Sequence, residues 1–309
     1  MRIKISMLLA AALGLSAPVL ATWTTPVPLT EVNIQPGEDW TPFLSFDGLT
    51  LYTSRVRTAV FYDGRIYEAT REQPFGPFTS VREITELNQA STHVLAPWVS
   101  ADNLRMYYHT EESTGWHIRV SERALVGDPW AHGTDISELN AFAKYNQTPK
   151  LTEDELTIFF GSYGPDVIPE DLDIYMATRP DRGSPFSNIT NLAQINTEWS
   201  EISPSPRPDG LELYFTSSRN GILQIFKASR ESSDDSFGNV EHLAFLDIPG
   251  GHSSHPFLSS DGSAIYFRGQ PGPQSSQDIY VSYIPEPGTL LLLGLGAVML
   301  WNKRSQGTA

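Results

Sequence analysis

The sequence contains no cysteine, so it offers neither a disulfide framework nor thiolate chemistry. Basic residues are scarce, with 21 Lys and Arg against 36 Asp and Glu and a net charge of −15. This balance argues against nucleic-acid binding, which needs a basic face for phosphate contacts. Long apolar runs stand only near the two ends. The 40% hydrophobic content, with 23 Gly and 23 Pro, predicts a packed domain rich in turns.

The N-terminal residues have the pattern of an export signal. Arg2 and Lys4 precede an apolar run at 5–15, and Val19 and Ala21 stand at the positions that a signal peptidase reads. We therefore expect residues 1–21 to be a signal peptide, with cleavage between Ala21 and Thr22.

The C-terminal residues, 284–309, have a second addressing pattern. Pro285, Glu286 and Pro287 precede an apolar run at 289–301 and a basic end. The run is shorter than the roughly 20 residues of a full membrane span, so we expect transient or stable anchoring of this short helix, with the basic end in the cytoplasm. The order of these features resembles the PEP-CTERM sorting signal of Gram-negative bacteria. The resemblance implies an exosortase as partner, removal of the helix, and a place in the periplasm, outer surface or polysaccharide-rich extracellular matrix.

An acidic turn recurs five times between the two ends. It reads Asp47-Gly48, Asp102-Asn103, Asp154-Glu155, Asp209-Gly210 and Asp261-Gly262, with the aspartates 55, 52, 55 and 52 residues apart. Each has a proline five residues before it and an aliphatic–aromatic pair four and five residues after it. Asp-Gly between apolar runs predicts a hairpin, because Gly accepts a positive φ. We assign these aspartates a structural role, in which each carboxylate binds the backbone amide two residues on.

A third and a fourth strand follow each turn, except that the fifth unit has no fourth strand. Units one to four carry a small residue, an arginine, an aromatic and a final pair such as Leu139-Asn140. The same fourth-strand pattern stands at the mature N-terminus as Trp23, Leu29 and Val32-Asn33. An open solenoid would not explain this displaced strand. The pattern predicts an all-β fold over residues 22–283, a five-bladed β-propeller of four-stranded antiparallel blades closed by its N-terminal strand. We expect the repeated arginines on the blade surfaces, paired with acidic neighbours.

The segments 207–217 and 260–267 resemble the TolB-type, WD-like propeller repeat. The likeness runs through all five units, although Asn103 and Glu155 replace the turn glycine in units two and three. The TolB resemblance would imply a six-bladed propeller joined to a separate N-terminal domain, whereas this chain has five repeats. The resemblance therefore implies the fold and not the protein-partner role.

Candidate ligand residues lie where the repeats differ, in the loops that enter the first strand of each unit. Five of these positions stand three residues before the repeat proline and hold Asp39, Val94, Asn146, Glu201 and Ser253. With their neighbours they predict a rim around the central channel, made of Glu38, Asp39, Trp40, His93, Tyr145, Asn146, Trp199, Glu201, His252 and His255. Such a rim suits a polar ligand such as a sugar, although an ordinary solvated rim is the plainer interpretation.

Three functions remain open. The preferred one is a non-catalytic module that binds glycans or envelope proteins. The second is a glycoside hydrolase or lyase using Asp39 and Glu201, because glycosidases need two carboxylates across the scissile bond. Known five-bladed glycosidases use three inner acids, and the other inner positions here are not acidic, so we expect no catalytic residue. The third is a metal site from Glu38, Asp39, His93 and His252, but no fixed ligand spacing supports it. We expect no metal and no cofactor.

Overall fold

The computed structural model describes residues 23–33, 36–57, 63–87, 93–165 and 171–284. The compact unit from Thr24 to Tyr283 contains all the strands and helices given below. The predicted signal peptide and the predicted sorting helix lie outside the described residues.

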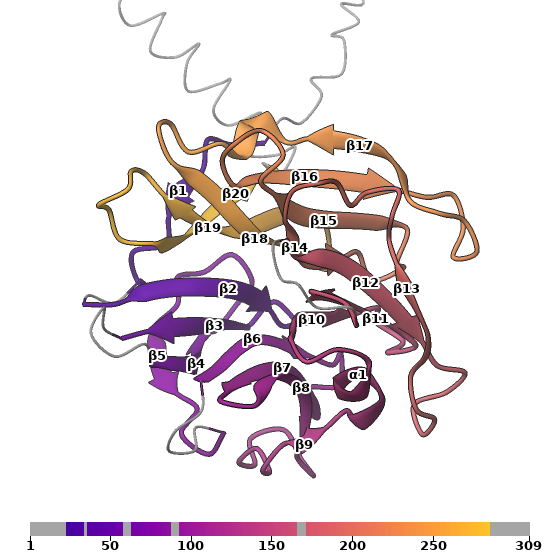
Figure 1. The fold of residues 1–309 in the computed structure, drawn as a ribbon. Coiled ribbons are helices and arrows are strands. Elements are labelled where there is room, and N and C mark those ends of the chain that lie inside the picture. Colours follow the sequence, from indigo (N-terminus) through magenta and orange to yellow (C-terminus); the bar gives the residue numbers. More distant parts are fainter. Residues whose placement is uncertain (1–22, 34–35, 58–62, 88–92, 166–170, 285–309) are drawn as a thin grey trace, which may run out of the picture. The chain divides into compact units, whose positions relative to one another are not determined.

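Five four-stranded antiparallel sheets make up this unit, which confirms the predicted propeller (Figure 1). Blade 1 contains β2 (Glu38–Leu44), β3 (Thr50–Val56), β4 (Gly64–Thr70) and β5 (Ser80–Glu83). Blade 2 contains β6 (His93–Val99), β7 (Arg105–Glu112), β8 (Gly115–Glu122) and β9 (Thr134–Asp135). Blade 3 contains β10 (Asn146–Leu151), β11 (Thr157–Ser162), β12 (Asp173–Thr178) and β13 (Ser187–Asn191). Blade 4 contains β14 (Glu201–Pro206), β15 (Glu212–Ser217), β16 (Gln224–Ser229) and β17 (Gly238–His242). Blade 5 contains β18 (His252–Leu258), β19 (Ala264–Gln270), β20 (Asp278–Tyr283) and, at its outer edge, β1 (Val27–Pro28).

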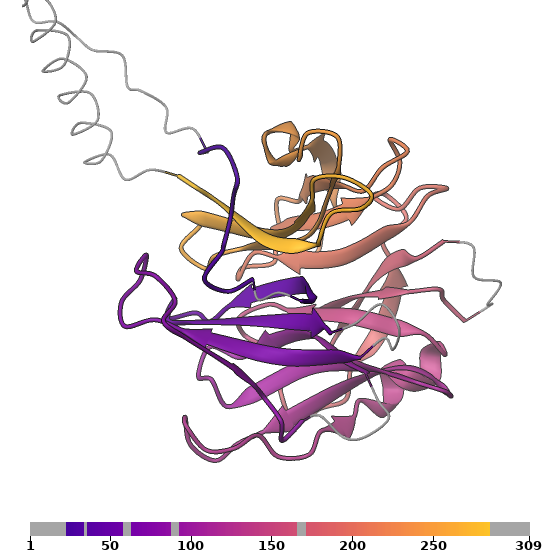
Figure 2. The same ribbon diagram turned by 90° about the vertical axis from the view of Figure 1, so that its left-hand side faces the viewer.

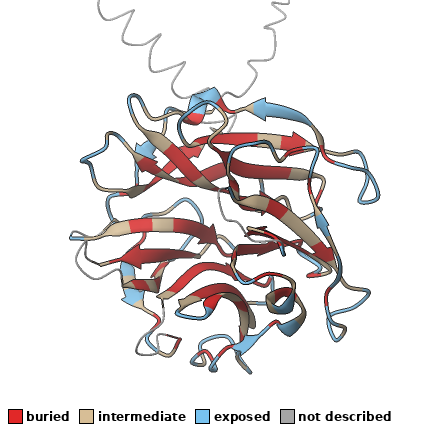
Figure 3. Ribbon diagram, in the orientation of Figure 1, coloured by how far each residue is buried: buried red, intermediate tan, exposed pale blue. Residues whose placement is uncertain are grey.

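The first strands of the blades contact one another in cyclic order, β2–β6–β10–β14–β18–β2, so the ring is closed. Short helices interrupt two of the connections between blades, α1 (Ser137–Phe142) and η1 (Ala244–Leu246). Among the described residues, no helix has the length and apolar character needed to span a membrane. Buried residues follow the inner strands, whereas the fourth strands are largely exposed (Figure 3).

The displaced N-terminal strand completes blade 5, as the sequence predicts. Strand β1 pairs antiparallel with β20, with Val27 opposite Val281, and the indigo segment runs beside the yellow strand in Figure 2. The Asn33 side chain makes two hydrogen bonds with the backbone of Ile279. Its Nδ2 donates to the carbonyl oxygen at 2.9 Å and its Oδ1 accepts from the amide at 2.8 Å. Asn196 makes the same two bonds to Ile174 in blade 3. The displaced segment therefore reproduces the contacts of an ordinary fourth strand.

The five acidic turns have the predicted geometry. The aspartate Oδ1 accepts from the amide two residues on in every copy, at distances between 2.9 and 3.1 Å. The next residue has a positive φ in each case, including Asn103 at 58° and Glu155 at 63°. Glu155 is almost fully buried and compensates for this backbone strain by binding the Arg105 guanidinium of blade 2, with an Nη2–Oε1 distance of 2.7 Å.

The repeated arginines mainly contact backbone and aromatic rings, and the predicted pairing with an acid is found for Arg179, whose Nη2 lies 3.8 Å from Glu155 Oε2. Each guanidinium donates from Nε to the carbonyl oxygen of the residue after the turn aspartate, as Arg123 does to Asn103 at 2.7 Å. The same guanidinium lies over the fourth-strand aromatic ring, with Arg123 4.2 Å from the centre of Trp130. The arginine thus joins the acidic turn to the outer strand, because a planar cation can stack and donate at once.

A β-bulge bends every first strand at one position. The residue before the repeat proline has a positive φ in all five blades: Thr41, Ala96, Thr148, Ser203 and His255, between 46° and 56°. The pairing register with the second strand shifts at the same place. An extra residue in one strand rotates the side chains before it, which changes where the predicted rim residues lie.

Candidate functional site

The five inner positions three residues before the proline are buried, with Asp39, Asn146 and Glu201 at 0% exposure. The bulge turns these side chains back toward the loop that precedes the strand. Asn146 and Ser253 each bind a backbone carbonyl in the short helix that follows the preceding fourth strand. Asn146 Nδ2 donates to Leu139 O at 3.1 Å, and Ser253 Oγ donates to Leu246 O at 2.7 Å.

Asp39 and Glu201 reach the equivalent carbonyls through an arginine. Arg55 donates from Nε to Asp39 Oδ1 at 2.8 Å and from Nη2 to Val32 O at 2.9 Å. Arg219 repeats this in blade 4, binding Glu201 Oε1 at 3.1 Å and Ile195 O at 2.7 Å. Enclosed carboxylates that are ion-paired in this way have the geometry of structural anchors, and they are not presented to a ligand.

The residues four before the proline join neighbouring blades. His93 Nδ1 accepts from the Gly64 amide at 3.1 Å, and His252 Nδ1 accepts from the Leu223 amide at 3.2 Å. Burial lowers the pKa of His93, which favours the neutral acceptor form. Glu38 is half-buried at the start of β2, and Trp40 lies under the Arg268 guanidinium, 4.5 Å from the ring centre.

The structure does not bring together the four residues that were considered as metal ligands. Within the described residues, no three His, Cys, Asp or Glu side chains come together in a way that would hold a metal ion. Glu38, Asp39, His93 and His252 therefore remain separate features of the rim.

Three aromatic rings meet on the loop face, by which we mean the face formed by the connections into the first and third strands. Trp116 lies 5.4 Å from Tyr145 and 6.0 Å from Tyr163, and the two tyrosines are 5.9 Å apart, as distances between ring centres. All three rings are half-buried. We call them the aromatic cluster. Only Tyr145 was predicted, because Trp116 at the start of β8 and Tyr163 in the connection from β11 to β12 lie where the lengths of the units vary.

Trp199 is a further aromatic residue on this face, with 47% of its surface exposed. Its neighbour Ser200 donates to Asp171 Oδ1 at 3.2 Å, which joins the connection into β14 to the connection into β12 beside Trp199. A cleft of about 420 Å³ opens on the same face between blades 4 and 5, and its lining includes Asp247, His252 and Ser253. This volume lies within the range of small-ligand sites, which is about 300–1,000 Å³.

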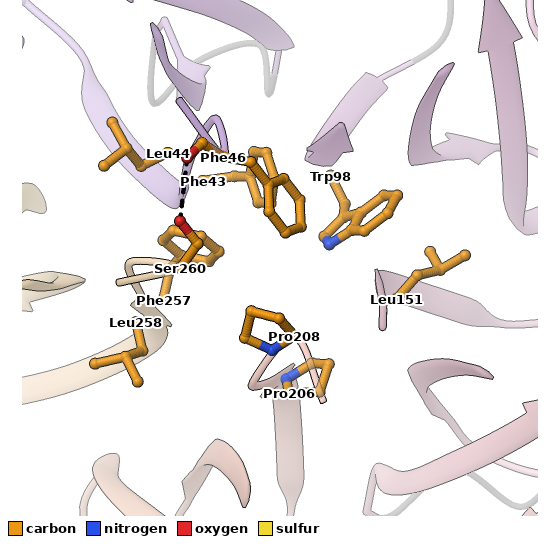
Figure 4. Close-up of a pocket in the computed structure, with 10 residues that line it drawn as sticks. All are labelled: Phe43, Leu44, Phe46, Trp98, Leu151, Pro206, Pro208, Phe257, Leu258 and Ser260. Carbon is orange, nitrogen blue, oxygen red and sulfur yellow. Dashed lines mark hydrogen bonds between the residues drawn. The ribbon is translucent and has the colours of Figure 1, made fainter. Parts of the chain in front are cut away.

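The opposite end of the channel is closed by aromatic residues (Figure 4). Phe43 lies 4.7 Å from Phe257 and 5.9 Å from Trp98 between ring centres, and Phe46 packs on Trp98 at 6.2 Å. The apolar pocket that these rings line, together with Leu44, Leu151, Pro206, Pro208, Leu258 and Ser260, has a volume of only about 20 Å³. That is room for about one water molecule, so a ligand would approach the channel from the loop face.

The C-terminus carries the deciding sequence feature. Residues 284–304 match the PEP-CTERM protein-sorting motif. The chain carries a PEP-CTERM sorting signal. This signal marks an exported protein that exosortase-type machinery recognises and sorts to the cell envelope or outer surface. The predicted motif residues Pro285, Glu286 and Pro287 lie inside the matched segment.

Solved structures that are similar to this chain share its propeller fold. A TolB protein from Agrobacterium tumefaciens is 16% identical, with a TM-score of 0.51 over 84% of this chain and 97% of that one. A family 117 glycoside hydrolase from Zobellia galactanivorans is 12% identical, with a TM-score of 0.56 over 84% and 89%. An endo-arabinase from Bacteroides thetaiotaomicron is 13% identical, with a TM-score of 0.53 over 85% and 98%. At these identities the likeness shows the fold alone. A comparison with curated proteins found no match.

Proposed function

We propose that the propeller is a non-catalytic binding module of the envelope or biofilm matrix of a Gram-negative bacterium, and that it binds glycans through its loop face. The observation that carries this proposal is the aromatic cluster of Trp116, Tyr145 and Tyr163. Sugar rings present apolar C–H faces that stack on aromatic side chains, while their hydroxyls need polar partners nearby. Half-buried rings on a rigid scaffold supply such a platform with little loss of side-chain entropy.

Polar groups beside the aromatic cluster fit the same ligand class. Burial raises the pKa of Tyr163, and the Asp171 carboxylate adds to the rise, so this acid lies close enough for its charge to reach the ring. Lys144 Nζ lies 5.1 Å from the centre of the Tyr145 ring. Donors and acceptors therefore surround the rings, as a hydroxyl-rich ligand requires.

The alternative function is a glycoside hydrolase or lyase, the class to which two of the structural neighbours belong by their names. It would need two carboxylates that face the substrate. The buried ion pairs of Asp39 and Glu201 with arginine support the binding role over hydrolysis, because a catalytic acid has to exchange protons with its substrate.

Glycan-array screening of the purified protein, followed by titration with the best ligand, tests the proposal. We expect Trp116→Ala and Tyr163→Ala each to weaken binding by about tenfold or more, since stacking contributes about 1–3 kcal/mol per ring in comparable recognition. Phe75→Ala is the matched control, because Phe75 is 55% exposed and lies in the connection from β4 to β5, away from the loop face.

Two outcomes would contradict the proposal. Unchanged affinity in both cluster variants would remove the loop-face site. Release of shorter sugars from the bound glycan, lost in Asp39→Asn or Glu201→Gln, would establish the hydrolase instead.

The sorting tail adds a proposal about location. We infer that the tail holds the exported chain in the membrane until an exosortase removes the apolar helix, after which the propeller joins the outer surface or matrix. Intact-mass measurement of the surface-associated protein tests this: a mass that ends before the 289–301 run is expected, and a full-length mass would contradict removal.

A further inference from the structure

Side chains from three different blades converge at the centre of the propeller. His109 comes from blade 2, Lys150 from blade 3 and His255 from blade 5. Burial, together with the smaller effect of the charges of Arg268, Lys150 and His109, lowers the pKa of His255 well below its ordinary value. Residues of blades 2, 3 and 5 can influence one another in this way only across the common axis, so the centre holds a group of cationic and imidazole side chains.

Several of these groups have hydrogen-bonding capacity to spare. The Thr148 amide donates to His109 Nδ1 at 3.3 Å, so the His109 proton is on Nε2. His109 Nε2, Thr148 Oγ1 and Ser203 Oγ are enclosed and have no hydrogen-bond partner among the described protein atoms. Their side chains are more than nine-tenths buried. Buried polar atoms normally have a partner, so these three point to a bound species.

Blade 3 lacks a side chain at a repeat position that lies next to the centre of the propeller. The second-strand position that lies beside the channel holds Ser54, His109, Thr216 and Arg268 in blades 1, 2, 4 and 5. Three of these bind the bulge residue of the next blade, as Ser54 Oγ accepts from the Ala96 amide at 2.8 Å. Blade 3 has Gly161 instead, and a Cβ placed there would lie 3.5 Å from Thr148 Oγ1. The absent side chain leaves a polar niche between blades 3 and 4, next to Thr148 and Ser203.

Lys150 supplies a cation beside this niche, two residues along β10 from Thr148. Its side chain is buried, its Nζ donates to Pro97 O, and the ammonium lies 5.3 Å from the centre of the Phe43 ring. One carbonyl satisfies one of the three ammonium donors. The ammonium therefore has hydrogen-bond donors left for a ligand.

We propose that the centre of the propeller, beside Gly161, is a binding site for an oxyanion. The donors are the Lys150 ammonium, the His109 Nε2–H and the hydroxyls of Thr148 and Ser203. A sulfate, a phosphate or a carboxylate presents several acceptor oxygens to such a set, and charge-assisted hydrogen bonds to it are the strong ones.

The acids near the centre leave this charge available. Glu111 is an acid that lies near one of the donors. Its Oε1 is 3.7 Å from His109 Nε2, and its side chain is 18% exposed. Asp39 is already paired with Arg55. Among the described residues Lys150 forms no ion pair, so its charge is available to an anion in a chain of net charge −15.

Isothermal titration at constant ionic strength and at a pH below 7, where Lys150 is charged, tests the site, with sodium sulfate and sodium phosphate as probes and sodium chloride as reference. We expect saturable 1:1 binding of at least one oxyanion to the natural protein. Lys150→Met and Ser203→Ala should each weaken it by about tenfold, and Gly161→Ser should block it by filling the niche. Lys227→Met is the control, because Lys227 is an outward lysine paired with Glu212. Ser203→Ala removes no protein hydrogen bond of the described structure, so a folding defect cannot explain its effect.

A second arm separates a free ion from a charged group on a sugar. Galacturonic-acid oligomers that bind, and that lose affinity in Lys150→Met, would show that the centre reads acidic glycans; binding of inorganic ions alone would show a site for free oxyanions. Both support the inference. The absence of saturable binding by every probe would overturn the inference. An affinity equal to that of the natural protein in Lys150→Met, Ser203→Ala and Gly161→Ser would overturn it too. Because the Trp116→Ala variant leaves the centre intact, loss of glycan binding there with oxyanion binding retained would keep the two proposals distinguishable.

Discussion

The Asp39 carboxylate and the Arg55 guanidinium form a fully enclosed ion pair, with an Nη2–Oδ1 distance of 2.7 Å. The pair connects β2, β3 and the carbonyl of Val32, and Glu201 with Arg219 repeats it in blade 4. Two of the five entries into a first strand are therefore held by a buried charge pair. Asp39 and Glu201, the two acidic residues among the five inner positions, therefore maintain the geometry of the ring.

Removing one partner of this pair should destabilise the fold. Asp39→Asn leaves the Arg55 guanidinium buried without its counter-charge, which typically costs about 3–5 kcal/mol. Urea unfolding followed by tryptophan fluorescence measures the loss. Asp63→Asn is the matched control, because Asp63 binds Arg57 at 2.7 Å on the surface, and exposed pairs contribute about 0–1 kcal/mol. A loss below about 1 kcal/mol in Asp39→Asn would contradict the structural role.

The two hydrogen bonds between Asn33 and Ile279 should contribute to the stability of the whole ring. Asn33→Ala removes two hydrogen bonds from the strand that completes blade 5, and each contributes about 0.5–1.5 kcal/mol net. We expect a lower melting temperature and, after deletion of residues 24–33, aggregation through the exposed edge of β20. Size-exclusion chromatography and thermal unfolding measure both effects. A deletion variant that stayed monomeric and equally heat-resistant would refute ring closure by this segment.

The stacked arginines give a test of specific chemistry. Arg123→Lys keeps the positive charge but loses the planar contact with Trp130 and the Nε donor to Asn103 O. We expect a loss of about 1–2 kcal/mol in the free energy of unfolding, whereas Arg82→Lys, at a half-exposed pair with Glu68, should change it by less than about 0.5 kcal/mol. Equal losses in the two variants would mean that charge alone matters.

The buried amine of Lys150 predicts how stability depends on pH. Burial lowers its pKa from 10.5 to about 7. Between these values the unfolded chain binds more protons than the folded one, so stability rises with pH across this window. Below pH 7 both states carry the charge and the full cost of burying it is present. Lys150→Met should flatten the rise in urea-unfolding free energy, whereas Lys227→Met should not. An unchanged slope in Lys150→Met would contradict a neutral buried amine.

Local chemistry explains why much of the fold was predictable. The turn aspartates act within three residues of backbone, so Asp209 and its Gly210 specify their own hairpin wherever they occur. The displaced strand was also predictable, because Val32-Asn33 carries the same side chains as the other fourth-strand ends and Asn33 makes the same bonds. Both features depend on sequence neighbours or on exact repetition.

The arrangement of the rim was not predictable, because it depends on the bulge. A regular alternation would point Asp39 and Glu201 at the channel, and the left-handed residue two positions on, Thr41 or Ser203, reverses that expectation. The main contacts of the arginines were not predicted for a related reason. Their spacing of seven residues from the aromatic is visible in the sequence, but the carbonyl that receives Nε becomes visible only when the turn is folded. Trp116 and Tyr163 lie outside the repeat pattern and gave no periodic signal.

The seam of the ring lies where Thr24 meets Tyr283, and the amide of Thr24 donates to the Tyr283 carbonyl at 2.8 Å. The earliest and the latest parts of the folded chain to leave the ribosome thus have to meet before the last blade exists. Blades 1 to 4 each take their four strands from one continuous segment, so only blade 5 depends on both ends of the propeller being present.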